Sequence, residues 1–136
     1  KATDDNYNGG VQFRSMPCTI PGRPFEMVGY QADILSWKRG ALYDEQRRWD
    51  FLGMQLGTPV DYKTNEWNDY IIRCEGPRVR IWLNGVKTTD YIEPYTDEPF
   101  EGIGTTVSQD GHIAFQIHEG KASEIWYKDI EIEELK

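Results

Sequence analysis

The sequence predicts an all-β domain, folded as an antiparallel β-sandwich, and three observations lead to this prediction. The 136 residues include 5 Trp, 8 Tyr and 5 Phe, residue types that strands favour. They also include 13 Gly and 7 Pro, which suit a fold with many turns. Finally, apolar and polar side chains alternate in several segments, and no segment shows the pattern of a long amphipathic helix.

The first half of the chain contains two segments with this alternation. Residues 11–15 place Val11 and Phe13 on one face, and residues 27–35 form the next expected strand. Residues 16–26 hold three prolines and a glycine, so we expect a loop there. Residues 36–65 lack a clean period and are expected to form a long irregular excursion, with a short helical turn over 44–49 as one option.

The second half of the chain is more regular. Asn84-Gly85, between two alternating segments, is a strong signal for a two-residue hairpin because both positions tolerate positive φ. A second long loop is expected over 93–111. The predicted strands are 67–75, 78–83, 86–92, 111–117 and 124–134. Together with the first half, these strands predict one sandwich domain over residues 1–136.

Charge and hydropathy exclude several classes of function. There are 15 basic and 23 acidic residues, which gives a formal charge of −8. An acidic domain is poorly suited to nucleic acid or to an anionic membrane surface. No apolar run approaches the roughly 20 residues that a membrane helix needs. The expected partner is therefore neither a nucleic acid nor a bilayer.

Cysteine and metal chemistry give weak signals. Cys18 and Cys74 could form one disulfide or remain two thiols, and the sequence leaves both options open. Two Cys and two distant His are too few ligands for a zinc site. We expect no metal and no cofactor, with calcium at the acidic segments 4–5 or 96–98 as a weak alternative.

Three predicted strands carry hydrogen-bonding couplets on the face opposite their apolar residues. Residues at i and i+2 point off the same face of a strand. Side chains with several directed donors and acceptors suit sugar hydroxyls. If the three strands are neighbours, the couplets form one polar floor; the alternative is that they are ordinary solvated residues. The couplets are Gln12/Arg14, Gln31/Asp33 and Gln116/His118.

The quoted segments, taken in order, resemble the 3-keto-disaccharide hydrolase family. The resemblance is carried by GVQFRS at 10–15, GYQADI at 29–34, GALYDEQRR at 40–48, EWNDYIIRCEGPRVRIWLNGV at 66–86, HIAFQIHEG at 112–120 and SEIWYKDIEIEEL at 123–135. It implies a concanavalin-like jelly roll that binds carbohydrate. It also implies action on glycosides oxidised to a ketone at C3, in the periplasm or outside the cell.

The resemblance further implies that strands precede residues 10–15 in family members. On that basis we expect this chain to be part of a longer domain, or to be completed by a larger assembly. Relatives often carry Glu and Gln at the positions of Gln31 and Asp33, so a base supplied by that Glu would be moved or lost in this chain.

The chemistry of such a reaction assigns candidate roles. A C3 ketone acidifies the C2 proton, so a base can form an enolate and the C1 substituent can leave. The candidate catalytic residues are His118 or Asp33 as base, Arg14 (or Lys128) as electrophile, and Asp44 (or Tyr43) as acid. The candidate substrate-binding residues are Gln12, Gln31, Tyr43, Arg47, Gln116, Trp126 and Lys128.

Each assignment has a structural alternative. His118 could be an ordinary satisfied histidine, Arg14 could pair with Asp33, and Trp126 could simply pack. For the whole domain, the alternatives to an enzyme are a non-catalytic carbohydrate-binding module and an interaction domain of a larger assembly.

Overall fold

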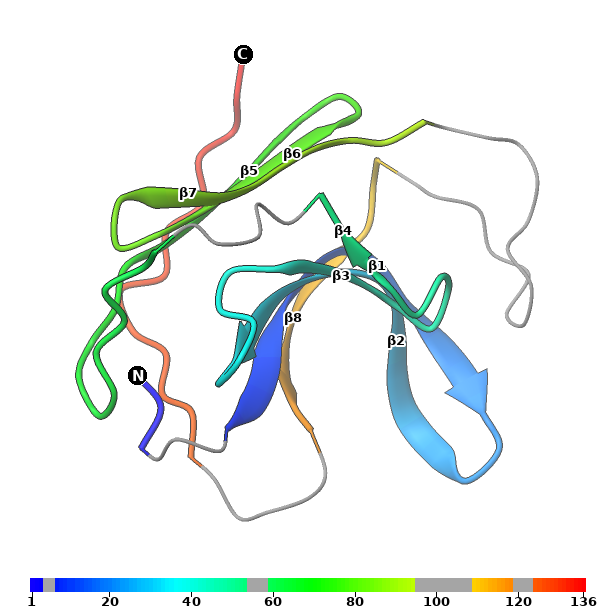
Figure 1. Cartoon of the computed structure of the whole chain (residues 1–136). Helices are drawn as coiled ribbons and strands as arrows, with labels where there is room; N and C mark the ends of the chain where they lie inside the picture. Colours follow the sequence, from blue (N-terminus) through cyan, green and yellow to red (C-terminus); the bar gives the residue numbers. More distant parts are fainter. Residues whose placement is uncertain (4–6, 54–58, 95–108, 119–123) are drawn as a thin grey trace.

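The strands of the domain form two antiparallel sheets that lie one above the other (Figure 1). The computed structural model describes residues 1–3, 7–53, 59–94, 109–118 and 124–136. Within these ranges the regular elements are all strands, so the predicted all-β sandwich is confirmed. The same ranges contain no helix long and apolar enough to cross a membrane.

The larger sheet has five strands in the order β4-β3-β2-β1-β8. Its central hairpin is formed by the two longest strands, which are followed by two short strands on one side and flanked by β8 on the other. Because β2, β1 and β8 are neighbours, the three polar couplets do come from adjacent strands, as the floor hypothesis required. The bounds are β1 (Asn8–Ile20), β2 (Arg23–Leu35), β3 (Leu42–Glu45), β4 (Phe51–Leu52) and β8 (His112–Ile117).

The smaller sheet is a three-stranded meander in the order β5-β6-β7. Asn84 and Gly85 have φ values of 49° and 78°, which is the conformation expected of a two-residue hairpin turn. The predicted strands 78–83 and 86–92 match β6 and β7. The bounds are β5 (Tyr70–Glu75), β6 (Arg78–Leu83) and β7 (Val86–Ile92).

The proline-rich segment 16–26 is strand rather than the loop expected from sequence. β1 and β2 continue through it and turn at Pro21 and Gly22. Pro17 is tolerated because the β1–β8 ladder ends at Ser15, so the strand beyond that point is paired on one side only.

Residues 36–65 also contain more strand than expected. β3 pairs with β2, β4 pairs with β3, and residues 46–48 form a turn instead of a helix. Strands of four and two residues are too short for a period-two pattern to identify from sequence.

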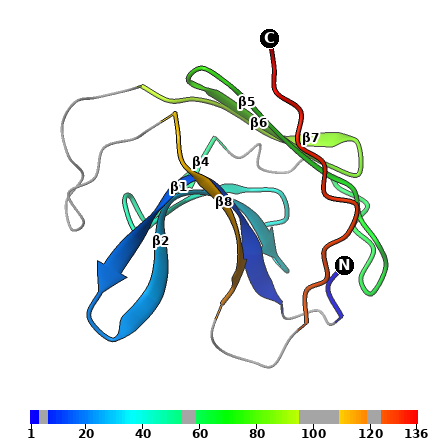
Figure 2. The ribbon, with the colours of Figure 1, turned by 180° about the vertical axis from the view of Figure 1, so that it is seen from behind.

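The C-terminal segment forms one isolated bridge, where the sequence predicted a strand over 124–134. Ala2 and Ile125 make the bridge, and the amide of Trp126 donates to the carbonyl of Lys1 at 2.8 Å. In both ribbon views the start of the C-terminal segment, drawn in orange, lies beside the N-terminal residues, and the chain then runs on to a C-terminus that lies far from the N-terminus (Figures 1 and 2). A segment in which polar and apolar residues alternate forms a strand only where another strand offers an edge for hydrogen bonding. Within the described residues, the strand pairing of the C-terminal segment goes no further than this bridge.

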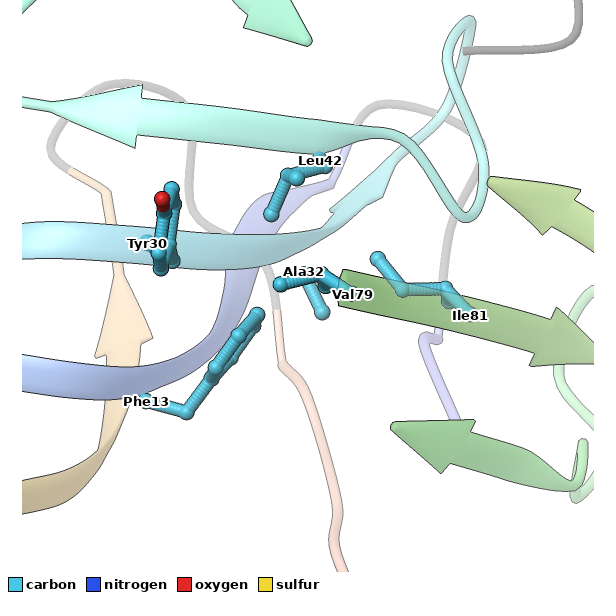
Figure 3. Packing of buried hydrophobic residues seen from close by; sticks show 6 residues of the cluster. All are labelled: Phe13, Tyr30, Ala32, Leu42, Val79 and Ile81. Carbon is cyan, nitrogen blue, oxygen red and sulfur yellow. The ribbon is translucent and has the colours of Figure 1, made fainter. Parts of the chain in front are cut away.

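A small core joins the two sheets. Val79 and Ile81 of β6 face the apolar side chains of the larger sheet (Figure 3). The stacked rings of Phe13 and Tyr30, 5.7 Å apart, extend this cluster along β1 and β2. Because Tyr30 and Ala32 face this core, their neighbours Gln31 and Asp33 must point off the opposite face of β2.

Candidate functional site

A polar cavity of about 520 Å³ lies on the face of the larger sheet opposite the core. Its polar lining includes side chains from three strands of that sheet. β2 provides Gln31 and Asp33, β3 provides Glu45, and β8 provides Gln116 with His118 just beyond its end. A pocket with a few convergent polar groups is the usual form of a small-molecule site.

A chain of side-chain hydrogen bonds crosses the floor of this cavity. Gln31 Nε2 donates to Asp33 Oδ1 at 2.5 Å and to Gln116 Oε1 at 2.9 Å. Gln116 Nε2 in turn donates to Glu45 Oε2 at 3.2 Å. The two carboxyl groups are therefore linked through two amides, which fixes the positions of all four side chains.

Gly10 of β1 makes this arrangement possible. It lies in register between Asp33 on β2 and Gln116 on β8. A Cβ atom at this position would lie 2.6 Å from Gln31 Cγ. Because Gly10 has no side chain, the side chain of Gln31 on β2 can extend across β1 and bond to Gln116 on β8.

The two carboxyl groups have raised pKa values. Burial, with a smaller contribution from the charge of Glu45, raises the pKa of Asp33 to about 7, while the hydrogen bond from Gln31 and the charge of Lys38 act against this. Burial also raises the pKa of Glu45, against the lowering effects of the Gln116 hydrogen bond and the His118 charge. Carboxyl groups with pKa values raised in this way are suited to proton transfer nearer neutral pH.

One buried acceptor belongs to Gln31, a residue that lines the cavity. Gln31 is almost fully buried, and its Oε1 has no hydrogen-bond partner among the described residues. Buried polar atoms are normally satisfied, so this oxygen is an exception among the residues that line the cavity.

Five of the residues singled out from sequence line the cavity. His118 is exposed at its rim, where the His118 amide donates to the carbonyl of Asn8 at 3.1 Å. The five are Asp33, His118, Gln31, Gln116 and Tyr43.

Arg14 and Gln12 lie outside the cavity lining. Arg14 sits in a β-bulge with a φ of 49°, so the simple alternation that placed it beside Gln12 breaks down there. Its Nη1 donates to the carbonyl of Gly76, in the turn between β5 and β6, at 2.7 Å. Gln12 is buried and donates to the carbonyl of Met27 at 3.4 Å. The expected floor of six residues thus contains four.

Asp44 and Arg47 are also behind the cavity rather than in its wall. Asp44 is fully buried, and its carboxylate binds both Arg47 and Arg48. Arg48 also forms an ion pair with Glu93, in which Nη2 lies 2.7 Å from Oε2. Asp44 is therefore the centre of a structural ion-pair network beneath the turn from β3 to β4.

Trp126 and Lys128 line a different space. They border a cavity of about 1160 Å³ between the sheets, which contains mostly apolar side chains. Lys128 Nζ lies 4.7 Å from the centre of the Trp67 ring. These two residues do not join the group around Asp33.

The metal and cysteine predictions can be compared with the described part of the chain. Within the described ranges, no group of three or more His, Cys, Asp and Glu side chains could hold a metal ion. The acidic segments 4–5 and 96–98 lie outside the described residues. Cys18 and Cys74 are both free thiols, so the disulfide option is not realised.

Comparison with known proteins identifies the family. The family model of the 3-keto-alpha-glucoside-1,2-lyase-like domain matches residues 1–133. This chain belongs to that family. The resemblance noted in the sequence motifs is thereby confirmed. A search of curated proteins found no match.

Sequence reasoning missed several residues of the cavity in this lyase-like domain. The candidate residues drawn from the sequence do not include Glu45, although it follows Tyr43 at i+2 and therefore shares its face. Trp37, Trp49 and Phe51 also line the cavity. The Gly9-Gly10 pair was an available signal, because glycines inside a strand often mark a close approach.

Proposed function

We propose that this domain cleaves glycosides whose sugar ring carries a ketone at C3. The observation that carries the proposal is that two carboxyl groups with raised pKa values, those of Asp33 and Glu45, line one cavity and are linked through the amides of two glutamines. Membership of the 3-keto-alpha-glucoside-1,2-lyase-like family supports the substrate class.

The proposed reaction has an elimination step and a hydration step. The ketone acidifies the C2–H bond, so a base removes that proton and the electron pair passes to the C3 oxygen as an enolate. The enolate returns to the ketone as the C1–O bond breaks, which leaves a C1=C2 double bond. Water then adds across this bond, with its oxygen on C1 and a proton on C2, so the net result is hydrolysis.

We assign the base to Asp33 and the acid to Glu45. A base works best when its pKa lies near the operating pH, and the pKa of Asp33 is about 7. Glu45, with its raised pKa, supplies the proton that the leaving oxygen needs. The amide N–H groups of Gln31 and Gln116 orient both carboxyl groups. His118 at the rim is the alternative base.

Turnover of a 3-keto-glucoside tests the proposal. We expect the wild-type protein to release the C1 substituent, and we expect the rate to rise with pH through about 7 because the base must be ionised. Asp33→Asn should lower kcat by at least about 100-fold, the size of a lost general base. His118→Ala should have a small effect.

Two outcomes would overturn the assignment. If the wild-type protein binds sugars but turns over no keto-glycoside, the domain is a carbohydrate-binding module instead of an enzyme. If His118→Ala abolishes turnover while Asp33→Asn retains it, His118 is the base. The periplasmic or extracellular location implied by the family resemblance belongs to this proposal, and fractionation of the native host would test it.

A further inference from the structure

The chain of side-chain hydrogen bonds at the floor of the cavity continues past Glu45. Gln46, the residue after β3, donates from Nε2 to Glu45 Oε1 at 3.2 Å and to Glu26 Oε2 at 3.1 Å. Neither Gln46 nor Glu26 is among the described residues that line the polar cavity. The carboxyl groups of Asp33 and Glu45 are thus connected to a third carboxyl group, which the proposed reaction does not use.

We propose that Glu26 and Gln46 are positioning residues for Glu45, and that the negative charge of Glu26 keeps Glu45 in its protonated form. The inference rests on the proposed function, in which Glu45 supplies a proton to the leaving oxygen, and it adds the groups that hold that proton in place. Two carboxyl groups joined through one amide nitrogen do not readily ionise together, because each negative charge disfavours the other.

The Gln46 side chain is held in one orientation. It is 2% exposed, and its amide nitrogen, which carries two N–H groups, bonds to two carboxyl groups. Its backbone has a φ of 61°, a conformation that is uncommon for residues other than glycine and persists where the surrounding contacts fix it. Glu45 therefore accepts one amide N–H on each carboxyl oxygen, from Gln46 on one side and from Gln116 on the other.

The charges around Glu45 act on it in both directions. Burial is the largest cause of its raised pKa, and the charge of Glu26 adds to this effect. The hydrogen bond from Gln116 and the charges of His118 and Arg23 lower the pKa of Glu45. Glu26 and Arg23 are therefore two charges of opposite sign, both outside the cavity lining, with opposite effects on Glu45. The other titratable groups close enough for the charge of Glu45 to raise their pKa values come from three strands, and they are Cys18 of β1, Asp33 of β2 and Tyr43 of β3.

The projecting part of the β1–β2 hairpin carries both of these charges. Arg23 and Glu26 lie in the first part of β2, whereas β2 pairs with β3 only from Gly29 to Ala32. Figure 1 shows this end of the hairpin extending beyond the rest of the larger sheet. Arg23 Nη1 lies 3.9 Å from Glu26 Oε1, and the two side chains are 52% and 26% exposed. Because water and Arg23 reach Glu26, its carboxylate can stay ionised while the more buried Glu45 is protonated.

Carbon-detected NMR titration of the Glu45 carboxyl group tests the inference without any substrate, with the signal assigned from Glu45→Gln. We expect Glu26→Gln to lower the pKa of Glu45 and Arg23→Gln to raise it, because the two substitutions remove charges of opposite sign. Glu26→Gln keeps a side-chain oxygen that can accept from Gln46, so the contact is preserved while the charge is lost. Glu75→Gln removes a carboxylate that pairs with arginines in the smaller sheet, and this matched control should leave the pKa of Glu45 unchanged.

Turnover of two substrates with different leaving groups is the second test. At about pH 8 we expect Glu26→Gln to lower kcat on methyl 3-keto-glucoside by about three- to tenfold, because less of Glu45 is protonated. The loss should shrink as the pH falls, since Glu45 is then protonated in both proteins. A 4-nitrophenyl group leaves without needing a proton, so kcat on 4-nitrophenyl 3-keto-glucoside should change by less than about twofold.

The outcomes separate this inference from the proposed function. An unchanged pKa of Glu45 in Glu26→Gln would overturn the inference, whether or not the wild-type protein cleaves glycosides. If the wild-type protein cleaves none, the proposed reaction is wrong, and the titration alone decides the role of Glu26. Equal losses on the two substrates at every pH would show that Glu26 supports only the fold of the site, and would also overturn the inference.

Discussion

The carboxyl group of Asp33 is fixed through both its side chain and its backbone. Its side chain accepts from Gln31, and its backbone amide donates to the carbonyl of Ala41 at 2.8 Å. Its carbonyl accepts from Gly40 and from the hydroxyl of Tyr70, the latter at 2.9 Å from the opposite sheet. An acid with this many constraints cannot turn toward water to recover its solvation, and its raised pKa follows from that.

Asp33→Asn should make the protein more stable at neutral and alkaline pH while it removes activity. The pKa of this carboxyl rises from 3.8 to about 7 on folding, so the folded state loses stability as pH rises from about 4 to about 7. A difference of this size corresponds to about 4 kcal/mol. We expect the Asp33→Asn substitution to raise Tm at pH 8 and to leave it nearly unchanged at pH 4.

Asp90→Asn is a control for which we expect the opposite change in stability at neutral pH. Hydrogen bonds from Arg78 and Lys87 hold the pKa of Asp90 well below its usual range. Its stabilising effect is therefore present above about pH 4 and is lost as the pH falls, so its replacement should lower Tm at neutral pH. A Tm for Asp33→Asn that falls at pH 8 would contradict our account of the buried carboxyl.

The face on which a single residue lies could be predicted from sequence where polar and apolar side chains alternate regularly along a strand. Gln31, Asp33 and Gln116 could be assigned to one face because β2 and β8 are regular at those positions. Arg14 could not, since a bulge has no signature in a single sequence and turns the side chain toward the other sheet. Glu45 was missed because its strand has only four residues.

At the scale of elements, the hairpin of β1 and β2 supports the polar floor because Gly10 of β1 carries no side chain. Gln31 on β2 and Gln116 on β8 belong to strands that do not touch, and they bond to each other across this glycine. The polar floor is thus a property of three strands together.

Gly10→Ala should damage the site more than the fold. The new Cβ would meet Gln31 Cγ at 2.6 Å and the carbonyl of Ala32 at 2.9 Å, so Gln31 must move and its bond to Gln116 must break. We expect a loss of about 1–3 kcal/mol in the free energy of unfolding together with at least a tenfold fall in kcat/KM. Thr19→Ala, exposed on the same strand, should change neither quantity. Full activity in Gly10→Ala would show that the amide chain is dispensable.

The turn from β3 to β4 depends on Asp44, and Asp44→Ala should be strongly destabilising. It leaves the buried guanidinium of Arg47 without its carboxylate, and breaking a buried ion pair on one side costs about 3–5 kcal/mol. Chemical denaturation measures this. Arg78→Ala removes an exposed ion pair to Asp90 and should cost far less, because exposed ion pairs contribute little to stability. Similar losses in the two variants would contradict the structural role of Asp44.

The elements themselves were partly predictable. The hairpin at Asn84-Gly85 and strands β6 and β7 follow from local turn chemistry and clear alternation. The strands around Pro17 and the short β3 and β4 depend on tertiary pairing, which local propensity does not reveal. The predicted strand over 124–134 has the right alternation, and only its first part finds a partner.

At the scale of the whole molecule, a small core carries the contact between the sheets. Phe13, Tyr30, Ala32 and Leu42 from the larger sheet meet Val79 and Ile81 from the smaller one. Hydroxyl groups add to this contact, since Thr88 and Thr89 both donate to the carbonyl of Gly40. The family assignment followed from motifs spread over the chain, whereas this narrow interface could not be located without the structure.

Ile81→Ala should cost about 2–5 kcal/mol in the free energy of unfolding, because Ile81 is 0% exposed at the centre of that interface. Ile71→Ala, on the adjacent strand but 57% exposed, should cost less than about 1 kcal/mol. Urea denaturation of both variants checks the difference. Equal costs would show that the sheets are held mainly by other contacts.

The position of Asp33 between the two cavities has one more consequence. Asp33 borders both the polar cavity and the larger space between the sheets. The Asp33 side chain points to the polar cavity, while its backbone carbonyl accepts from the Tyr70 hydroxyl of the smaller sheet, so packing between the sheets positions the backbone that carries the carboxyl. Packing mutations that narrow or widen the inter-sheet space, far from any sugar contact, would retune the pH optimum of the domain without altering a single group that touches substrate.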